Sequence, residues 1–205
     1  MTVTAVFFDV GGVLLSNGWD HDQRAEALEH FGLERDEFED RHREVVGSLE
    51  TGRCSLADYL RATVFYEERA FSPEEFRAYM EGCSSAFPGN LEVVGKLNAS
   101  GKYLLATLNN EGRELNEFRI RHFELRRRFT TFFTSSLLGM MKPEEEIYRA
   151  ALGITQREAG EALFVDDRRQ NLEPAANLGM RTLLFRGGEG PDALLRGLAE
   201  QGVEA

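Results

Sequence analysis

The chain has 205 residues and a net charge of −11, with 42% hydrophobic and 29% charged residues, which is typical of a soluble globular protein. The acidic balance argues against a nucleic-acid partner, and no apolar run approaches the roughly 20 residues that span a bilayer. No charged-then-apolar leader is recognisable, and Cys54 and Cys83 lack the spacing of a metal site or disulfide framework, so we expect a cytoplasmic monomer or homodimer without a membrane partner.

Five apolar stretches are predicted to be strands: Val3–Phe8, Tyr103–Leu108, Thr131–Thr134, Leu163–Val165 and Thr182–Phe185. Their apolar residues are continuous rather than alternating, as in parallel strands that are covered on both faces. Helical patterns separate the later strands, for example the apolar positions Ile147, Ala150 and Ala151. This alternation predicts an α/β fold with a doubly wound, Rossmann-like parallel sheet.

The interval between the first two strands breaks this alternation. It is roughly ninety residues long, which is too long for one crossover, and most of it has helical periodicity. Ser72-Pro73-Glu74-Glu75 is a strong helix start, and Gly32 and Gly52 are plausible helix ends. We therefore predict an inserted helical subdomain at 17–87, a core at 1–16 and 88–205, and hinges at 16–18 and 88–90.

Polar residues follow the predicted strands where ligands bind in open α/β sheets, beyond the carboxyl ends. Asp9 follows the first strand, Asp166 and Asp167 follow the fourth, and Lys142 stands beyond the third. The second strand ends in Thr107-Leu108-Asn109-Asn110. Three carboxylates, a hydroxyl group and a lysine at one sheet edge suit a magnesium ion and a phosphate group.

These residues resemble, in chain order, the four motifs of the haloacid dehalogenase-like hydrolases. The matching segments are Phe7 to Leu14 (Phe-Phe-Asp-Val-Gly-Gly-Val-Leu), Thr107, Met141-Lys142-Pro143-Glu144 and Phe-Val-Asp-Asp ending at Asp167, followed by Asn171 and Gly179-Met180. The resemblance covers the whole chain and makes the inserted subdomain the family's helical cap. It implies a Mg²⁺-dependent phosphatase that acts on a small phosphorylated metabolite, with a sugar phosphate favoured.

The resemblance also implies a role for each residue. Asp9 is the nucleophile that forms an aspartyl-phosphate, and it shares Mg²⁺ with Asp167, with Asp166 nearby and with the backbone carbonyl of Gly11. Lys142 neutralises phosphate charge and lowers the pKa of Asp9 by proximity. Phosphate oxygens are bound by Thr107 and by the loop that follows it, Leu108 and Asn109.

Two positions depart from the family pattern. Gly11 stands where phosphatases of the family carry a second Asp, the general acid for the leaving group, and Leu108 stands where members often carry Asn. Positioned acid–base groups contribute about 10²–10⁴-fold to a rate. We therefore expect leaving groups that need little protonation, such as an anomeric sugar phosphate, or an acid that comes from the cap.

Two alternatives stand beside the phosphatase. A metal-independent 2-haloacid dehalogenase would use Asp9 against a carbon–halogen bond, although Asp166 and Asp167 would then be an unexplained burial of negative charge. A catalytically silent metal- or ligand-binding module would explain Gly11 but has no need of a nucleophile. The cap sets the substrate in any of these cases, and its first residues to inspect are Trp19, His21, Arg24, Arg53 and Tyr59. The helical histidines, His30, His42 and His122, have no metal-ligand spacing and are predicted to be surface or packing residues.

Overall fold

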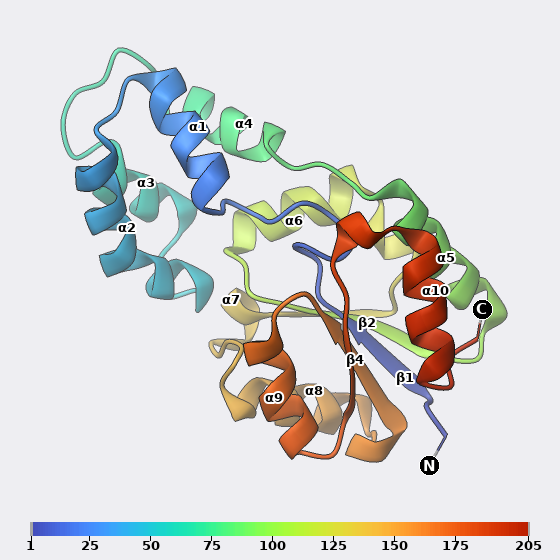
Figure 1. Cartoon of the computed structure of the whole chain (residues 1–205). Helices are drawn as coiled ribbons and strands as arrows, with labels where there is room; N and C mark the ends of the chain where they lie inside the picture. Colours follow the sequence, from blue (N-terminus) through green and yellow to red (C-terminus); the bar gives the residue numbers. More distant parts are fainter. Residues whose placement is uncertain (1, 205) are drawn as a thin grey trace.

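The computed structural model describes residues 2–204, so the two ends of the predicted core, residues 1 and 205, lie outside it. Within the described residues, five strands form one parallel sheet in the order β3-β2-β1-β4-β5 (Figure 1). The strands are β1 (Ala5–Phe8), β2 (Leu104–Asn109), β3 (Thr131–Thr134), β4 (Ala162–Asp166) and β5 (Arg181–Leu184). The predicted doubly wound α/β sheet is confirmed, with strand ends that differ from the prediction by at most two residues.

Helices cover both faces of the sheet, and the strands are buried on both sides as their continuous apolar residues predicted. One face packs against α5 (Pro88–Ser100), α6 (Arg113–His122) and α10 (Pro191–Glu200). The other face packs against α8 (Glu145–Thr155) and α9 (Arg169–Asn177). Short elements complete the core: α7 (Ser135–Leu138), η1 (Leu125–Arg127), η2 (Ala159–Glu161) and η3 (Gly187–Glu189). None of the helices in residues 2–204 is long and apolar enough to cross a membrane.

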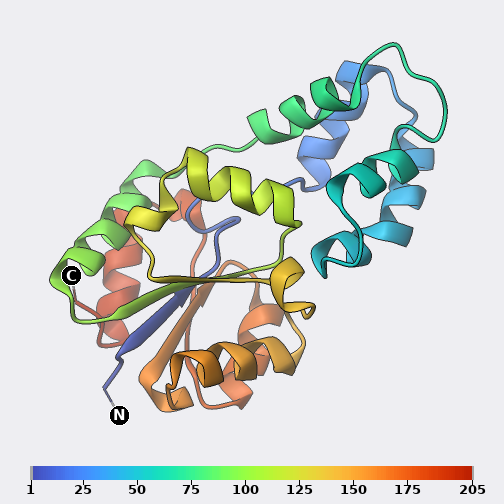
Figure 2. The same ribbon diagram turned by 180° about the vertical axis from the view of Figure 1, so that it is seen from behind.

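Four of the helices between β1 and β2 form the cap, and they pack around a hydrophobic cluster that Leu115 of α6 joins from the core. They are α1 (His21–Phe31), α2 (Arg35–Glu50), α3 (Leu56–Thr63) and α4 (Pro73–Gly82). Two predicted boundaries are confirmed: Ser72 and Glu75 form a capping box at the start of α4, and Gly32 ends α1 with a left-handed backbone, φ 64°. The cap lies beyond one end of the core (Figures 1 and 2).

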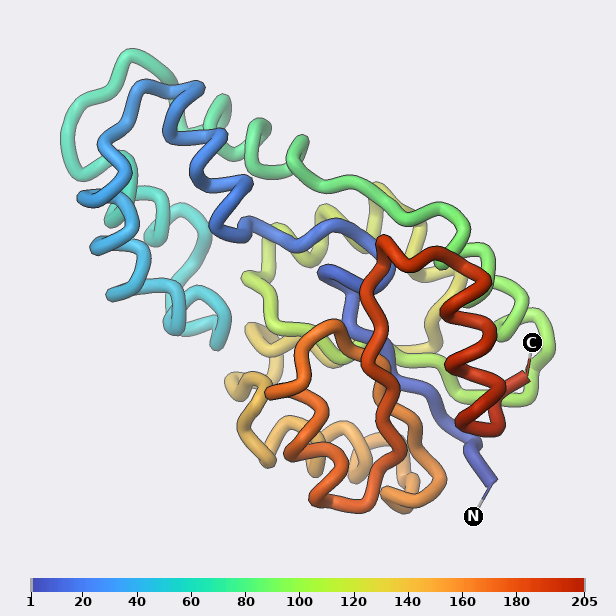
Figure 3. Tube along the Cα trace, in the orientation of Figure 1, coloured from blue at the N-terminus to red at the C-terminus, as the bar shows by residue number. Residues whose placement is uncertain are grey.

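The chain passes between core and cap in two segments (Figure 3). The segments are hydrogen-bonded to each other, since the Ser16 backbone N–H donates to the Ser85 carbonyl at 2.8 Å. The first crossing lies at residues 16–18, where the hinge was predicted. The second differs, because Pro88 occupies the first turn of α5, where proline is favoured, and the crossing lies before it. Asn90 is buried there and donates to the Val13 and Gly187 carbonyls, which fixes this turn to the core.

A buried polar contact joins three aromatic residues inside the cap. The Tyr59 hydroxyl accepts a hydrogen bond from Trp19 Nε1 at 2.9 Å and lies 2.8 Å from His42 Nδ1. A phenol has one proton, so a hydroxyl that accepts from Trp19 can donate to His42 only when the imidazole is neutral. Burial lowers the pKa of His42 to about 4, helped by the nearby Arg24 and Arg43 and opposed by Glu39.

Acid should therefore weaken the cap through His42. Below pH 6.5, the ordinary pKa of histidine, His42 binds a proton in the unfolded chain but stays neutral in the folded protein. The free energy of unfolding therefore decreases as the pH falls from 6.5 towards 4. We expect His42→Gln to remove about 1–2 kcal/mol of the stability difference between pH 7 and pH 5, measured by urea unfolding. His122→Gln, at an exposed histidine, is the control. An equal acid loss in wild type and His42→Gln would contradict the expectation.

Candidate active site

Asp9 stands at the centre of the sheet edge, directly after β1, where strand order reverses between β2 and β4. Its backbone N–H donates to the Val165 carbonyl, which fixes the residue against β4. One carboxylate oxygen, Oδ1, accepts from the Val10 backbone N–H at 2.8 Å and lies 3.1 Å from Lys142 Nζ. Asp9 is 8% exposed, and it lines a cavity. Its carboxylate is therefore largely buried and held in one orientation, yet a ligand in the cavity can reach it.

Lys142 is the cation of the site and is also buried. Its Nζ lies 2.7 Å from Asp166 Oδ2 as well as 3.1 Å from Asp9 Oδ1. Asn110 holds the lysine backbone from both sides, because its Oδ1 accepts from the Lys142 N–H and its Nδ2 donates to the Lys142 carbonyl, each at 2.8 Å. Burial alone would lower the pKa of Lys142, but the two carboxylates outweigh it and raise that pKa. The lysine is therefore fixed and charged.

Asp166 and Asp167 differ in how much of their hydrogen-bonding capacity is already used. Both oxygens of the fully buried Asp166 are engaged: by Lys142, by Asn171 Nδ2 at 3.1 Å and by the Arg168 backbone N–H at 2.8 Å. Oδ1 of Asp167 is buried and has no hydrogen-bond partner within residues 2–204. Burial raises the pKa of Asp167, and the neighbouring Asp166 charge adds to this. The contact of Asp167 Oδ1 is a long ion pair with Arg168 Nε at 3.9 Å, so this oxygen is less engaged than either oxygen of Asp166.

The three aspartates together fit a divalent cation. Asp9, Asp166 and Asp167 each offer one oxygen, and these atoms lie within 4.8 Å of one another. With Lys142 among the three carboxylates and Arg168 at 3.9 Å from Asp167, one negative charge stays uncompensated when all three are ionised. Oδ1 of Asp167 accepts no hydrogen bond within residues 2–204, and a set of carboxylate oxygens is the kind of ligand that Mg²⁺ prefers. Gly12 leaves the space for Asp167, since a Cβ on Gly12 would lie 2.5 Å from Asp167 Oδ2.

Lys142 has the expected effect on Asp9, but burial decides the net pKa of that carboxyl group. Lys142 does lower the pKa of Asp9, but burial raises it more, and the charges of Asp166 and Asp167 add to the rise. The net result is a pKa above the usual range for an aspartate. A further positive charge at the cluster is therefore what would hold Asp9 ionised at neutral pH.

Two of the predicted phosphate-binding residues lie away from the cavity. Thr107 and Leu108 are fully buried and do not line the cavity; Thr107 pairs with Phe8 inside the sheet, and Leu108 belongs to a core cluster. The reason is that β2 runs on to Asn109. At about 3.3 Å per residue, Thr107 lies about 6.6 Å short of the strand end. Asn109 is the last residue of β2, one residue beyond the predicted end at Leu108, and it lines the cavity.

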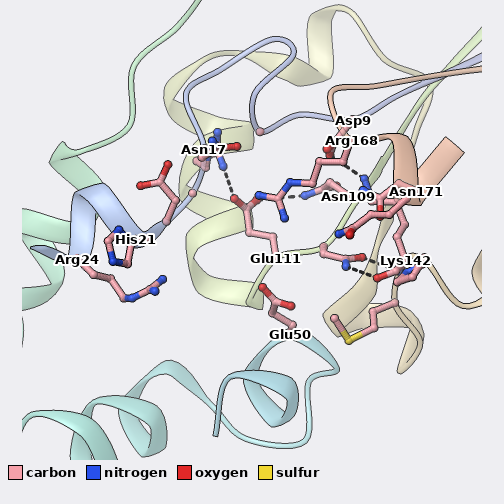
Figure 4. A pocket seen from close by; sticks show the side chains of 18 residues that line it. Asp9, Asn17, His21, Arg24, Glu50, Asn109, Glu111, Lys142, Arg168 and Asn171 are labelled. Atoms are coloured by element: carbon pink, nitrogen blue, oxygen red, sulfur yellow. Dashed lines mark hydrogen bonds and ion pairs between the residues drawn. The ribbon is translucent and has the colours of Figure 1, made fainter. Parts of the chain in front are cut away.

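The cavity has a volume of about 420 Å³ and is formed by both core and cap (Figure 4). Of the predicted site residues, Asp9, Gly11, Asn109 and Lys142 line it. From the cap side it is lined by Asp20, His21, Arg24 and Glu50. Arg24 is already bound, to Glu39 at 2.8 and 3.0 Å and to the Trp19 carbonyl.

The other cap residues singled out in the sequence do not reach the cavity lining. Trp19 and Tyr59 are part of the cap's hydrophobic cluster, and Arg53 is exposed. Among the predicted surface or packing histidines, His30 and His122 are exposed, whereas His42 is buried. Large aromatic side chains bury most surface inside a small helical unit, which explains why Trp19 and Tyr59 pack rather than face a ligand.

Residues 3–179 match the family model of the haloacid dehalogenase-like hydrolases. The chain belongs to this family. The match spans the cap as well as the strands that carry Asp9, Lys142 and the Asp166–Asp167 pair, so the enzyme is a HAD-like hydrolase with a helical cap.

Solved structures share this HAD-like fold. A HAD family enzyme from Bacteroides thetaiotaomicron superposes with a TM-score of 0.83 over 95% of this chain and 98% of that chain, at 21% identity. The same enzyme in complex with magnesium and inorganic phosphate superposes with a TM-score of 0.79 over 95% of this chain and all of that chain, at 21% identity. An L-2-haloacid dehalogenase superposes with a TM-score of 0.62 over 88% of this chain and 83% of its own, also at 21% identity. At these identities the likeness shows the fold alone.

Curated relatives match shorter stretches of the HAD-like chain. Rat (Rattus norvegicus) bifunctional epoxide hydrolase 2 is 40% identical over 63 residues, which is 31% of this chain and 11% of that protein. A sesquiterpene phosphatase of Aspergillus oryzae is 29% identical over 99 residues, 48% of this chain and 50% of that protein. The matched region thus spans about a tenth of the epoxide hydrolase and half of the phosphatase.

A buried polar network behind Asn109 was not foreseen from the sequence. Glu111 Oε2 accepts from Asn109 Nδ2 at 3.2 Å and from Asn116 Nδ2 at 2.9 Å, while its Oε1 pairs with the buried Arg119. Arg119 also donates to the Ser16 carbonyl at the first crossing to the cap. The only signal in the sequence is the polar Asn-Asn-Glu run after an apolar strand. Arg119, on a helix rich in charged residues, looks like any surface arginine.

Proposed function

We propose that this HAD-like hydrolase is a Mg²⁺-dependent phosphatase that cleaves a small phosphorylated metabolite, with a sugar phosphate favoured, through an aspartyl-phosphate at Asp9. The observation that carries the proposal is the buried Asp9 carboxylate, oriented by Val10 and Lys142 beside two further carboxylates. A nucleophile next to a cation site is what phosphoryl transfer requires, because the anionic substrate repels an anionic nucleophile. Two of the similar proteins support the proposal: one is a sesquiterpene phosphatase, and the other is a HAD family enzyme solved with magnesium and inorganic phosphate.

The residues of the chain have distinct roles in this proposal. Mg²⁺ would be held by Asp9, Asp167 and the Gly11 carbonyl, with Asp166 behind them, and it supplies positive charge that stabilises the phosphoryl oxygens. Asp9 attacks phosphorus and Lys142 neutralises phosphate charge. Asn109, at the end of β2, is the residue of the predicted Thr107-Leu108-Asn109 set whose side chain lines the cavity. An amide nitrogen carries two protons, so Nδ2 can serve a phosphoryl oxygen as well as Glu111.

The lining and the size of the cavity suit a substrate with a small polar leaving group. Its lining includes Asp20, Glu50, Arg168 and Gln170 around the nucleophile, which are groups that hydrogen-bond to hydroxyl groups. A volume of about 420 Å³ lies within the range of small-molecule sites. A cytoplasmic location without a nucleic-acid or membrane partner is part of the proposal, supported by the net charge of −11 and by two unpaired cysteines. The proposed assembly is a monomer or homodimer.

Hydrolysis of 4-nitrophenyl phosphate, of a panel of sugar phosphates and of 2-haloacids, each with and without Mg²⁺, tests the proposal. Mg²⁺-dependent release of phosphate supports it, and faster turnover of sugar phosphates supports the substrate class. Metal-independent halide release from 2-haloacids would replace it with the dehalogenase. Mg²⁺ binding without turnover of any substrate would replace it with the silent module.

Gly12→Ala should weaken Mg²⁺ binding. Gly12 has φ +72°, and the added Cβ would meet Asp167 Oδ2 at 2.5 Å, so the carboxylate has to move away from the aspartate cluster. We expect about a tenfold or larger loss of Mg²⁺ affinity, measured as the Mg²⁺-induced rise in melting temperature, together with about 1–2 kcal/mol of backbone strain. Gly188→Ala is the matched control, since no atom lies within 4 Å of a Cβ there. An unchanged Mg²⁺ response in Gly12→Ala would remove Asp167 from the site.

A further inference from the structure

Glu50 is a cavity residue that the family motifs do not assign. It is the last residue of α2, and its carboxyl group points into the cavity from the cap, while Asp9 lies across the cavity on the core side (Figure 4). The loop that follows Glu50 rests on the core. Gly52 has φ +69° and approaches the Ser136 carbonyl so closely that a Cβ would overlap it. This contact between the cap loop and α7 holds Glu50 over the site.

The carboxyl group of Glu50 differs from the other acidic groups that line the cavity. Among residues 2–204, no hydrogen bond or ion pair engages either of its oxygens. Asp20, in contrast, accepts from the Gln23 backbone N–H at 3.0 Å, and both oxygens of Glu111 are taken by Arg119 and by two amide side chains. Glu50 is therefore the cavity carboxyl that is free to exchange a proton.

The surroundings of Glu50 favour its protonated form. Burial raises the pKa of Glu50, and the Glu111 carboxylate adds to this. The cations Arg168, Lys142 and Arg24 oppose the rise without cancelling it. A carboxyl group with a raised pKa keeps its proton to a higher pH than an exposed glutamate does, which suits a group that gives a proton and takes it back.

The geometry of phosphoryl transfer places the need for a proton on the cap side. The nucleophile and the leaving oxygen are roughly in line through phosphorus. When Asp9 attacks phosphorus, the leaving group therefore departs on the side away from Asp9. Glu50 lies on that side, whereas Gly11, on the core side, has no side chain to offer. The unengaged carboxyl group of Glu50 thus lies where it could supply the proton that the first motif, with Gly11, does not.

We propose that Glu50 is the general acid and base of the reaction, an assignment that rests on the proposed phosphatase function. As the bond from Asp9 to phosphorus forms, the phosphorus–oxygen bond to the leaving group breaks, and the leaving oxygen takes the proton of Glu50. The resulting Glu50 carboxylate then takes a proton from water. That water attacks the phosphoryl group on Asp9, releases inorganic phosphate and restores protonated Glu50.

Two substrates that differ in their leaving group test this role. 4-Nitrophenolate departs without a proton, whereas the alkoxide of glycerol 2-phosphate needs one. In rapid-mixing experiments, Glu50→Gln should slow transfer of the phosphoryl group from glycerol 2-phosphate to Asp9 by about 10²–10⁴-fold and from 4-nitrophenyl phosphate by less than about threefold. Because the second step also loses its base, 4-nitrophenyl phosphate should release one equivalent of nitrophenol in a burst and leave phosphorylated protein, detected by intact mass.

The controls separate this proposal from the function on which it rests. Glu44→Gln, at an exposed glutamate of the same helix, should behave as wild type towards both substrates. Glu50→Asp keeps the carboxyl group and should retain more of the activity towards glycerol 2-phosphate than Glu50→Gln does. Equal slowing with both substrates, or a rise in KM alone, would show that Glu50 only binds substrate and would overturn the proposal. Absence of Mg²⁺-dependent phosphate release from either substrate by the wild-type protein would overturn the phosphatase function itself.

Discussion

Asp9→Asn should abolish turnover of 4-nitrophenyl phosphate, with a loss in kcat of at least about 10⁴-fold. The amide is nearly the same size as the carboxylate but is not a nucleophile, so no phosphorylated intermediate forms. Lys142 keeps its pairing with Asp166 at 2.7 Å, and the fold should therefore survive. Phosphate release and intact mass after substrate addition are the measurements.

The same variant also has an expected effect on stability. Because burial raises the pKa of Asp9, folding with a charged Asp9 is costly at neutral pH, and the neutral amide removes this cost. Asp9→Asn should thus melt at the same temperature as wild type or higher. Asp22→Asn, at an exposed aspartate on α1, controls for the change from acid to amide. Residual turnover of Asp9→Asn above a few per cent of wild type would assign the nucleophile to another residue.

Lys142→Met should destabilise the protein by about 3–5 kcal/mol at pH 7, because it leaves buried carboxylates without their cation. The loss should depend on pH in a definite direction. Without Lys142 the pKa of Asp9 rises further, so folded Asp9 holds its proton at a pH where the unfolded chain has released it. Stability is then fully present below about pH 4 and is lost as the pH rises. Urea unfolding at pH 5 and pH 7 measures the difference.

Mg²⁺ should recover part of the stability that Lys142→Met loses, since a cation bound at the aspartate cluster replaces some of the missing positive charge. Lys96→Met, at an exposed lysine of α5, should change stability little and show no added dependence on pH. A Lys142→Met variant as stable as wild type at pH 7 would mean that the aspartates do not carry the negative charge assigned to them.

The sequence predicted the elements whose signals are local. Buried parallel strands have continuous apolar residues, and Ser72-Pro73 marks the start of α4 by its own capping chemistry. The order Asp9, Lys142, Asp166-Asp167 along the chain was enough to predict their meeting, because parallel strands bring their carboxyl ends to one edge. The cluster of three aspartates around Lys142 agrees with that prediction.

The errors have a common physical origin in long-range packing. Whether β2 ends at Leu108 or at Asn109 depends on its pairing with β3, where Asn109 stands opposite Thr134, and the sequence of β2 alone does not show this. The net pKa of Asp9 depends on how deeply it is buried. The Glu111–Arg119 pair joins a loop to a helix face eight residues on, and nothing local distinguishes Arg119 from an exposed arginine.

The contact of the Glu111–Arg119 pair with the first crossing segment limits how the enzyme can be re-engineered. Gly18 lies against this pair so closely that a Cβ would come within 2.6 Å of both side chains, and Arg119 also binds the Ser16 carbonyl. A cap transplanted from another member of the family would have to bring a glycine to this position, or exchange Glu111 and Arg119 with it. Glu111 also accepts a hydrogen bond from Asn109, so a chimera that breaks this contact would disturb the cavity-lining end of β2 as well as the cap. The cap and the loop after β2 should therefore be transferred together in a chimera.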